Sequence, residues 1–316
     1  MLSVQIYQER SQFNQEAALT LTVVLAAVSL VGVLLFRGSL KRPGAAASKG
    51  TRKPIRSTGG RIVLGLLAWI CGAALLTPHV VIVWLSFVSH PEWYSEVLPR
   101  TLTLANYETL FSARRSLTPI LNSLWMSALA TVGTALVALP AAYLIARRRR
   151  GGKWLNVLVM IPWALPGTVI AMNLIVAFNE GWWAIYNTVW ILPLAYFVRN
   201  VPLLTRMAGA AIEPFDGALL EAGQTLGASR WYCFVRVALP LLMPAVVAGM
   251  ALVFATSLGE FVASILLYTP GNLPISVQIN MEWRESVGAA FAYSVLLMIL
   301  VGITFAASRR LVGRTM

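Results

Sequence analysis

The sequence has 316 residues, of which 58% are hydrophobic and only 12% are charged, and its mean hydropathy is +0.72. A soluble domain averages about a quarter charged residues, so this composition excludes an ordinary water-soluble fold. The net charge of +13 does not indicate nucleic-acid binding, because the basic residues gather in short segments between apolar stretches, which is a signal of membrane topology.

Seven stretches of the chain are long and apolar enough to cross a membrane, which requires roughly 20 mostly apolar residues. The chain is therefore expected to be all-α and polytopic. Several stretches contain proline, which membrane helices tolerate because neighbouring helices satisfy the freed backbone groups. We predict spanning helices at 17–36, 62–88, 120–146, 154–178, 183–204, 241–268 and 287–307.

The distribution of lysine and arginine predicts the orientation of these helices. The segments 37–61, 147–153 and 205–240 and the tail after residue 307 contain 19 of the 25 basic residues, and all fall on one side of the seven-helix arrangement. Basic segments stay in the cytoplasm. The N-terminus is therefore predicted to lie outside and the C-terminus inside.

The start of the chain repeats its end. Residues 2–6 (LSVQI) match residues 275–279 (ISVQI), and the same register pairs Arg37 with Arg310. A polar stretch and one apolar helix follow in both copies. This pattern predicts that the chain carries the end of one unit followed by a complete second unit.

The repeat divides the chain into three parts. Residues 1–36 are expected to be the last helix of a preceding unit, residues 37–61 a basic cytoplasmic linker, and residues 62–310 a complete six-helix unit. The linker assignment also rests on its Gly, Ala, Ser and Pro content. The alternative is an extra N-terminal transmembrane helix within an ordinary subunit.

The cytoplasmic segment 205–240 contains the most regular pattern. Asp216 suits a helix N-cap, and Gly227 suits the left-handed residue that ends a helix. Pro240 lies where the next membrane helix begins, and proline is favoured in the first turn of a helix. The spacing i, i+3, i+4, i+7 predicts one apolar face on a short helix, formed by Leu219, Ala222, Gly223 and Leu226.

From Glu221 the sequence reads EAGQTLGASRWYCFVRVALP. It resembles the EAA signature of ABC importer permeases: Glu-Ala-Ala, three residues, Gly, nine residues, Ile, one residue, Leu-Pro. The spacing matches throughout, and only Gly223 and Val237 depart from the pattern. Asn106-Tyr107 and residues 257–261 (SLGEF) are also similar to segments of these permeases. The resemblance covers roughly residues 62–310, and the tandem layout is most similar to the fused permeases of ferric-iron importers.

This resemblance implies a six-helix ABC importer transmembrane domain plus one extra N-terminal helix, in the bacterial cytoplasmic membrane. The expected partners are a dimer of ATPase subunits that binds the ATP, a second permease unit, an external substrate-binding protein and lipid, with no nucleic acid and no cofactor on this chain. The expected substrate is ferric iron, ahead of thiamine, phosphonate, polyamine or another small solute. The residues expected to couple to the ATPase, with Glu221 as polar anchor, are Leu219, Leu220, Glu221, Ala222, Gly223, Leu226, Gly227 and Pro240.

Ionisable and polar groups within the predicted helices are candidates for the substrate passage, because burying them in a membrane is costly. Glu260, inside helix 241–268, and the adjacent Ser257 are the first candidates, and Asn173 is a weaker one. The competing interpretation places Glu260 near the outer end of its helix or in a structural pair. Arg199 is expected to extend from the inner end of its helix toward the membrane surface.

Other functional classes lack their sequence signatures. The chain contains no G-x-x-x-x-G-K-[ST] loop and none of the common hydrolase motifs, so an enzyme is not expected and ATP must come from a partner. The two histidines, His79 and His90, lack partners at metal-ligand spacing. The alternative function is a secondary transporter driven by an ion gradient, which would show more intramembrane acids.

Overall fold

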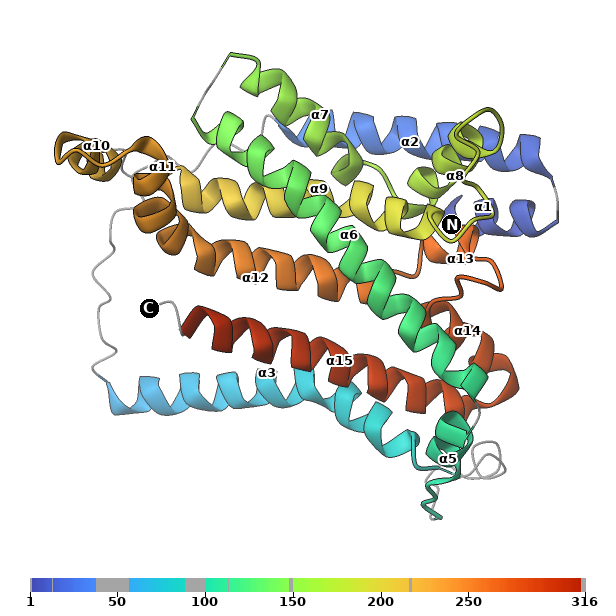
Figure 1. Cartoon of the computed structure of the whole chain (residues 1–316). Coiled ribbons are helices and arrows are strands. Elements are labelled where there is room, and N and C mark those ends of the chain that lie inside the picture. The colour runs from blue at the N-terminus through green and yellow to red at the C-terminus, as the bar shows by residue number, and fades with distance from the viewer. Residues whose placement is uncertain are drawn as a thin grey trace.

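A computed structural model describes residues 2–12, 14–37, 57–88, 101–112, 114–147, 150–215 and 218–313. Within these ranges the chain forms helices and turns, with one isolated bridge between Val88 and Leu102. Figure 1 shows the long helices running alongside one another. The helices are α1 (Leu2–Ser11), α2 (Gln15–Arg37), α3 (Thr58–Leu85), α5 (Ala105–Ser112), α6 (Arg114–Ala146), α7 (Gly152–Ala164), α8 (Gly167–Phe178), α9 (Ile191–Ile212), α10 (Ala218–Thr225), α11 (Arg230–Cys233), a π-helix (Phe234–Ala238), α12 (Leu239–Leu258), α13 (Ser264–Leu267), α14 (Ile275–Glu285) and α15 (Val287–Gly313).

Helix α9 is the centre of the fold, because α6 and α12 both pack along it. Small residues allow these helices to approach closely, as in other membrane bundles. A Cβ atom added to Gly249 of α12 would lie 2.6 Å from Cδ1 of Leu204 on α9. The α9 side chains Ile191, Leu192 and Tyr196 are almost fully buried. The fold of the second half of the chain is therefore built around α9.

The structure contains five helical stretches long and apolar enough to cross a membrane, as judged on the described residues: 15–32, 58–85, 116–146, 231–258 and 287–312. The chain is thus a multi-pass membrane protein, as predicted. The predicted helix 154–178 is wrong as a single element, because α7 and α8 meet at an angle of 107°. Leu165 is extended (φ −101°, ψ 134°) before Pro166, as expected for a residue that precedes proline. Counted as one broken span, this pair gives a sixth crossing.

Two further predicted boundaries are wrong. Helix 183–204 is displaced along the chain, since α9 begins at Ile191 and continues to Ile212, and residues 179–190 form bends and turns. Helix α9 is also not among the stretches apolar enough to cross a membrane, so the described residues give five or six spans instead of the predicted seven. Asn187 in this segment has a positive φ of 63°, which is incompatible with a helix. Helix 241–268 ends at Leu258. In both cases apolar residues in turns extended the hydrophobic pattern beyond the helix.

The repeated sequence takes the same form in both copies. A short helix is followed by a long one in α1–α2 and again in α14–α15. The two copies have different neighbours: α2 contacts α7 and α8, whereas α15 contacts α12, α3 and α5. The division into a preceding unit, a linker and a second unit stays a prediction, and residues 38–56 of the linker lie outside the described residues.

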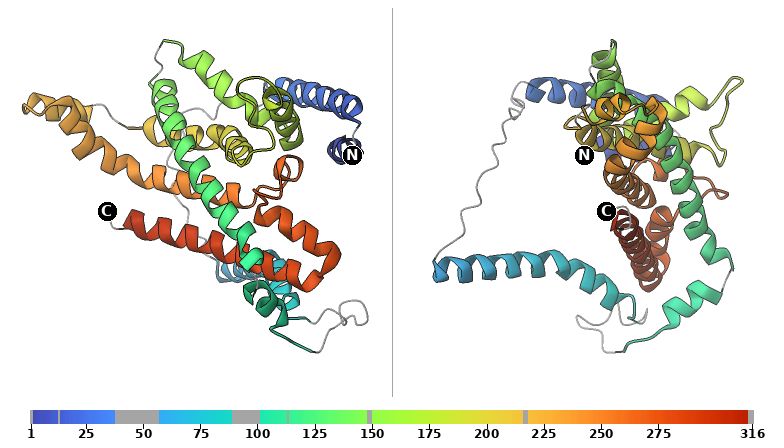
Figure 2. Two further views of the ribbon diagram at one scale, coloured as in Figure 1. Left: turned by 45° about the vertical axis from the view of Figure 1, so that its right-hand side comes forward. Right: turned by 60° about the vertical axis from the view of Figure 1, so that its left-hand side comes forward.

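Helix α3 is peripheral, and none of its residues is buried. Figure 2 shows it extending away from the other helices in the right-hand view. Its C-terminal end is held by Asn106 of α5, whose side-chain amide donates to the carbonyls of Ser86 (2.8 Å) and Val88 (3.0 Å). A Cβ atom on Gly288 of α15 would lie 2.5 Å from this amide, so the glycine allows α5 to approach α15. Asn106 therefore has a structural role.

The ends of the helices separate into two groups (Figure 1). Helices α10 and α11, the beginning of α3, the end of α6, the beginning of α7 and the end of α15 lie toward one end of the molecule. Helices α1, α5, α13 and α14 lie toward the other. The described parts of the basic segments thus share one end, as the charge pattern predicted.

Candidate functional site

Helices α10 and α11 form a protrusion at the end of the molecule that carries the basic segments (Figure 1). We call residues 218–234 the protrusion. Its second part continues into the membrane without a break, because α11, the π-helix and α12 follow directly from Arg230 to Leu258. Leu239 donates its backbone N–H to the carbonyl of Phe234, the five-residue spacing of a π-helix. Pro240 lies in the first turn of α12, as predicted.

The turn after α10 has the hydrogen bonds of a Schellman motif. Gly227 has a φ of +86°, and its N–H donates to the carbonyl of Gln224 at 2.9 Å. The N–H of Ala228 donates to the carbonyl of Gly223 at 3.1 Å. The prediction that Gly227 is the left-handed residue that ends this helix is therefore confirmed. The predicted N-cap, Asp216, lies outside the described residues.

Gly223 faces Cys233 inside the protrusion, not a solvent-exposed surface. A Cβ atom added to Gly223 would lie 2.7 Å from Sγ of Cys233, which is 1% exposed. Gly223 therefore packs against the second helix of the protrusion, and the role of the predicted apolar face in binding the ATPase stays a prediction. The signature has alanine where this chain has Gly223. The methyl group of an alanine would collide with the thiol of Cys233, which explains the glycine.

This contact predicts that Gly223→Ala loosens the protrusion. Overpacking costs about 1–3 kcal/mol, so limited proteolysis between α10 and α11 is expected to become about tenfold faster, in line with the lower half of that range. Gly223→Ala/Cys233→Ala is expected to restore the original rate, because Cβ of residue 233 lies 3.9 Å away. Gly209→Ala is the control, since nothing lies within 4 Å of its Cβ position. Equal cleavage of the single and double variants would contradict this account.

The outer surface of the protrusion carries several large apolar side chains and one exposed acid. Leu226 is 89% exposed, Trp231 73% and Leu219 50%. Trp231 stacks on Phe234 with ring centroids 5.8 Å apart. Glu221 is also exposed, and within the described part of the chain its carboxylate has neither a hydrogen bond nor an ion pair. Several exposed apolar side chains of this size on one short segment are typical of a protein-binding surface.

Apart from the protrusion, a polar site lies at the end of α12. Glu260 follows α12 instead of lying inside it, and it is 8% exposed. Its Oε2 lies 2.7 Å from Nε of Arg199, and its Oε1 accepts the N–H of Ala263 at 3.0 Å. The interpretation of Arg199 as extending to the membrane surface is therefore wrong. This arginine lies within α9 and forms an ion pair.

Further hydrogen bonds make this site a junction between four helices. The carbonyl of Glu260 accepts the hydroxyls of Ser264 on α13 (2.6 Å) and Ser276 on α14 (2.8 Å). Asn200 of α9 donates to Ser257 of α12 at 3.1 Å and accepts from the hydroxyl of Thr256 at 2.8 Å. We call this set the polar junction: Tyr196, Arg199, Asn200, Thr256, Ser257, Glu260, Ser264 and Ser276.

The predicted passage residues are not all brought together. Ser257 and Glu260 share the polar junction, and Ser257 is 1% exposed. Asn173 lies on an exposed position of α8 and takes no part in the junction. Sequence reasoning missed Asn200. The available signal was an Arg-Asn pair within an apolar stretch, since an arginine there requires a partner. The role of these residues in a passage stays a prediction.

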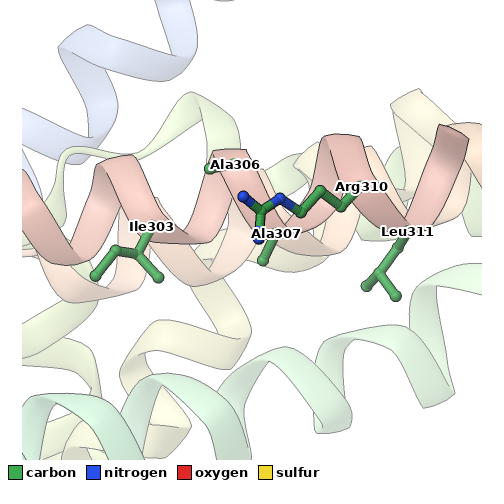
Figure 3. Close-up of a pocket in the computed structure, with 5 residues that line it drawn as sticks. All are labelled: Ile303, Ala306, Ala307, Arg310 and Leu311. Atoms are coloured by element: carbon green, nitrogen blue, oxygen red, sulfur yellow. The ribbon is translucent and has the colours of Figure 1, made fainter.

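The hollow shown in Figure 3 lies along the C-terminal half of α15 and has a volume of about 520 Å³. Within the part of the chain that the structure describes, its lining residues all belong to this one helix: Ile303, Ala306, Ala307, Arg310 and Leu311. None of the predicted passage residues lines it. An open, mainly apolar surface on a spanning helix needs no ligand to explain it, because lipid chains cover such faces.

The chain is similar to known membrane transport proteins. Residues 135–316 match the family model described as "Binding-protein-dependent transport system inner membrane component". The chain is 29% identical over its whole length to the probable ABC transporter permease protein y4fN of Sinorhizobium fredii, of which it covers 58%. It is 26% identical over 94% of its length to the Fe(3+)-transport system permease protein FbpB 2 of Haemophilus influenzae, again covering 58%.

A relative of different length was also found. The putative 2-aminoethylphosphonate transport system permease protein PhnV of Salmonella choleraesuis is 28% identical over 79% of this chain and 93% of its own length. Among solved structures, a bacterial ABC transporter involved in alginate import aligns with a TM-score of 0.62 at 17% identity, covering 82% of this chain and 99% of the other. A subunit of the MetNI methionine ABC transporter aligns with a TM-score of 0.52 at 19% identity, covering 63% and 94%.

Proposed function

The chain belongs to the family of binding-protein-dependent transport system inner membrane components, and from this premise we propose that it couples a separate ATPase to a passage for a small solute. It is an ABC importer permease subunit in a bacterial inner membrane. The observation that carries the coupling proposal is the protrusion, which combines an exposed apolar surface with the EAA signature. ATP is bound and hydrolysed by the partner subunit in this proposal.

The protrusion is connected so that it can transmit force. The helical run from Trp231 to Leu258 is continuous, so displacement of α11 moves α12 with it. At the far end of α12 the polar junction links this helix to α9, α13 and α14. Docking of the ATPase on α10 and its closure around ATP would therefore tilt α12 and α9 together. The bend at Leu165–Pro166 allows α8 to move separately from α7.

We propose ferric iron as the substrate. The relative named for Fe(3+) transport matches 94% of this chain, whereas the relative named for 2-aminoethylphosphonate transport matches 79%. The match to the relative of the ferric type thus extends over more of this chain. Phosphonate is the second candidate because its named relative is of similar identity. An external binding protein and a second permease unit are further proposed partners.

Dependence on the ATPase tests the function directly. The chain is produced together with the ATPase, binding protein and permease genes that neighbour it, and the complex is reconstituted in liposomes with ATP enclosed. Uptake of radioactive iron by these vesicles is expected to require ATP, the binding protein and an intact ATPase. Uptake that persists without ATP and collapses with a protonophore would instead establish the alternative, an ion-gradient-driven transporter.

The substrate is tested separately from the mechanism. Ferric iron, 2-aminoethylphosphonate and thiamine are presented singly, and the ATPase rate and the uptake of each are measured. Ferric iron alone is expected to stimulate ATP hydrolysis through its binding protein. Stimulation by the phosphonate instead would reject iron and leave the coupling proposal intact.

A further inference from the structure

Helix α15 carries an arginine within an otherwise apolar hollow. The residues that line this hollow recur three and four positions apart, so they share one face of the helix. They are Ile303, Ala306, Ala307, Arg310 and Leu311, and all of them are exposed (Figure 3). Lipid chains account for the apolar part of this face. They do not account for the arginine, because a cation at the level of a membrane requires an anionic or hydrogen-bonding partner.

The position of Arg310 along α15 places it in the headgroup layer of a membrane. The apolar span that contains it covers 26 residues, Val287–Val312. At 1.5 Å per residue this span is about 39 Å long, which exceeds the roughly 30 Å of the hydrocarbon core and approaches the thickness that includes the headgroups. Arg310 lies two residues before the end of the span. It is therefore at the level of the lipid phosphates, at the end of the molecule that carries the basic segments.

The side chain of Arg310 points back along the helix into the hollow. Figure 3 shows its guanidinium beside Ala306 and Ala307, on the side toward the beginning of α15. Side chains of an α-helix lean toward its N-terminus. An arginine near the C-terminal end of a span therefore leans toward the membrane interior instead of away from it. The two alanines leave the space that the guanidinium and a bound group would share.

The protein itself supplies no counter-charge for this guanidinium within the described ranges. The ion pair found there joins Arg199 to Glu260, in another part of the fold. Arg310 has neither a hydrogen bond nor an ion pair with any residue that the structure describes. The neighbouring Arg309 is also exposed, so the end of α15 carries two adjacent positive charges. This combination calls for an anion from outside the chain.

We propose that the hollow on α15 binds an anionic phospholipid. The planar guanidinium of Arg310 matches the oxygens of a phosphate, and an acyl chain would lie over Ala306, Ala307 and Ile303 toward the membrane interior. A lipid with net negative charge is favoured over a zwitterionic one, because each basic residue near the surface attracts anionic headgroups. A protein partner would have to bring a carboxylate to this depth, where lipid phosphates are already present. The inference goes beyond the proposed function and does not depend on it.

A photoactivatable lipid tests the site. The protein and the subunits that purify with it are reconstituted in phosphatidylethanolamine liposomes with a trace of phosphatidylglycerol that carries a diazirine in its acyl chain. After irradiation, the adducts are mapped by mass spectrometry. The wild type is expected to carry adducts within residues 303–311. Phosphatidylethanolamine with the same label should give about fivefold fewer adducts there, the factor by which one basic residue near the surface favours an anionic lipid.

Two variants separate the headgroup contact from the chain contact. Arg310→Gln removes the cation and is expected to lower phosphatidylglycerol adducts at residues 303–311 about fivefold. Ala307→Leu keeps the cation but fills the hollow, so adducts of both lipids should fall. Both positions are exposed, so neither change disturbs the packing of α15. Arg309→Gln is the matched control, because it removes the same charge from a neighbouring residue that does not line the hollow. Its adducts should stay near the wild-type level.

Several outcomes would overturn the proposal. Equal labelling by the two lipids, or an equal fall in Arg309→Gln and Arg310→Gln, would show that the site has no headgroup preference of its own. Displacement of the labelled lipid by inorganic phosphate, with no effect of Ala307→Leu, would identify a site for free phosphate. Wild-type protein without adducts at residues 303–311 would show that another protein covers this face. Transport is not measured, so failure of ATP-dependent uptake would leave this result standing.

Discussion

Arg199→Ala is expected to destabilise the protein by about 3 kcal/mol, the low end of the range for breaking a buried ion pair. The variant leaves the carboxylate of Glu260 without its guanidinium partner, although this residue is only 8% exposed. The loss of stability is expected at the low end of this range because the Arg199 side chain is 35% exposed and water can reach part of the site. The measurement is thermal unfolding of the purified protein in detergent, with an expected fall in Tm on the order of 5–10 °C.

Glu260→Gln serves as the matched comparison. It leaves the arginine unpaired, but this longer side chain is partly exposed and can reach water, so the loss is expected to be smaller. Glutamine also keeps an oxygen that can accept the N–H of Ala263. Arg199→Lys should fall between the two, since it keeps the charge without the planar guanidinium. Equal stability of all three variants and the wild type would show that the ion pair does not hold the junction.

Glu221→Lys is expected to weaken association with the ATPase at least tenfold while the chain still folds and inserts. The residue is exposed and its carboxylate has no partner within the described ranges, so the free chain loses nothing when it is changed. Reversal of one charge at a docked surface typically costs several kcal/mol, since like charges are then brought together. Each 1.4 kcal/mol is tenfold in affinity, so co-purification of the ATPase should fall at least tenfold.

Glu213→Lys is the control for this experiment. Glu213 is also an exposed acid, and it lies directly after α9, outside α10. The same change of charge is therefore made near the protrusion but away from its apolar surface. Co-purification and uptake should stay near the wild-type level in this control. Retained ATPase binding in Glu221→Lys would remove this residue from the interface.

The sequence predicts the fold well where one physical signal dominates. Long apolar stretches located α2, α3, α6 and α15, and the basic segments correctly predicted which ends lie together. Gly227 was predictable because only a left-handed glycine fits the end of α10. The signature located the protrusion and Pro240 at the start of α12. These features depend on local sequence, so a single sequence is sufficient to find them.

The errors occur where tertiary contacts or turns decide the structure. Composition alone does not show that Leu165–Pro166 breaks a span or that residues 179–190 are not helical. The partner of Arg199 is 61 positions away in the chain, at Glu260. Likewise, the inward direction of Gly223 depends on Cys233 in the next helix. Such contacts become visible only when helices distant in sequence are placed side by side.

In the proposed complex, the π-helix at Phe234–Ala238 would set the angle at which the protrusion meets the ATPase. A π-helical turn holds about one more residue than an α-helical turn, so the side chains before it are rotated about the helix axis relative to those after it. Each residue of an α-helix advances the phase by about 100°. The outer surface of the protrusion and the face of α12 toward the membrane interior therefore do not have to follow one helical repeat. One inserted residue turns the protrusion relative to α12 and leaves the packing of α12 unchanged.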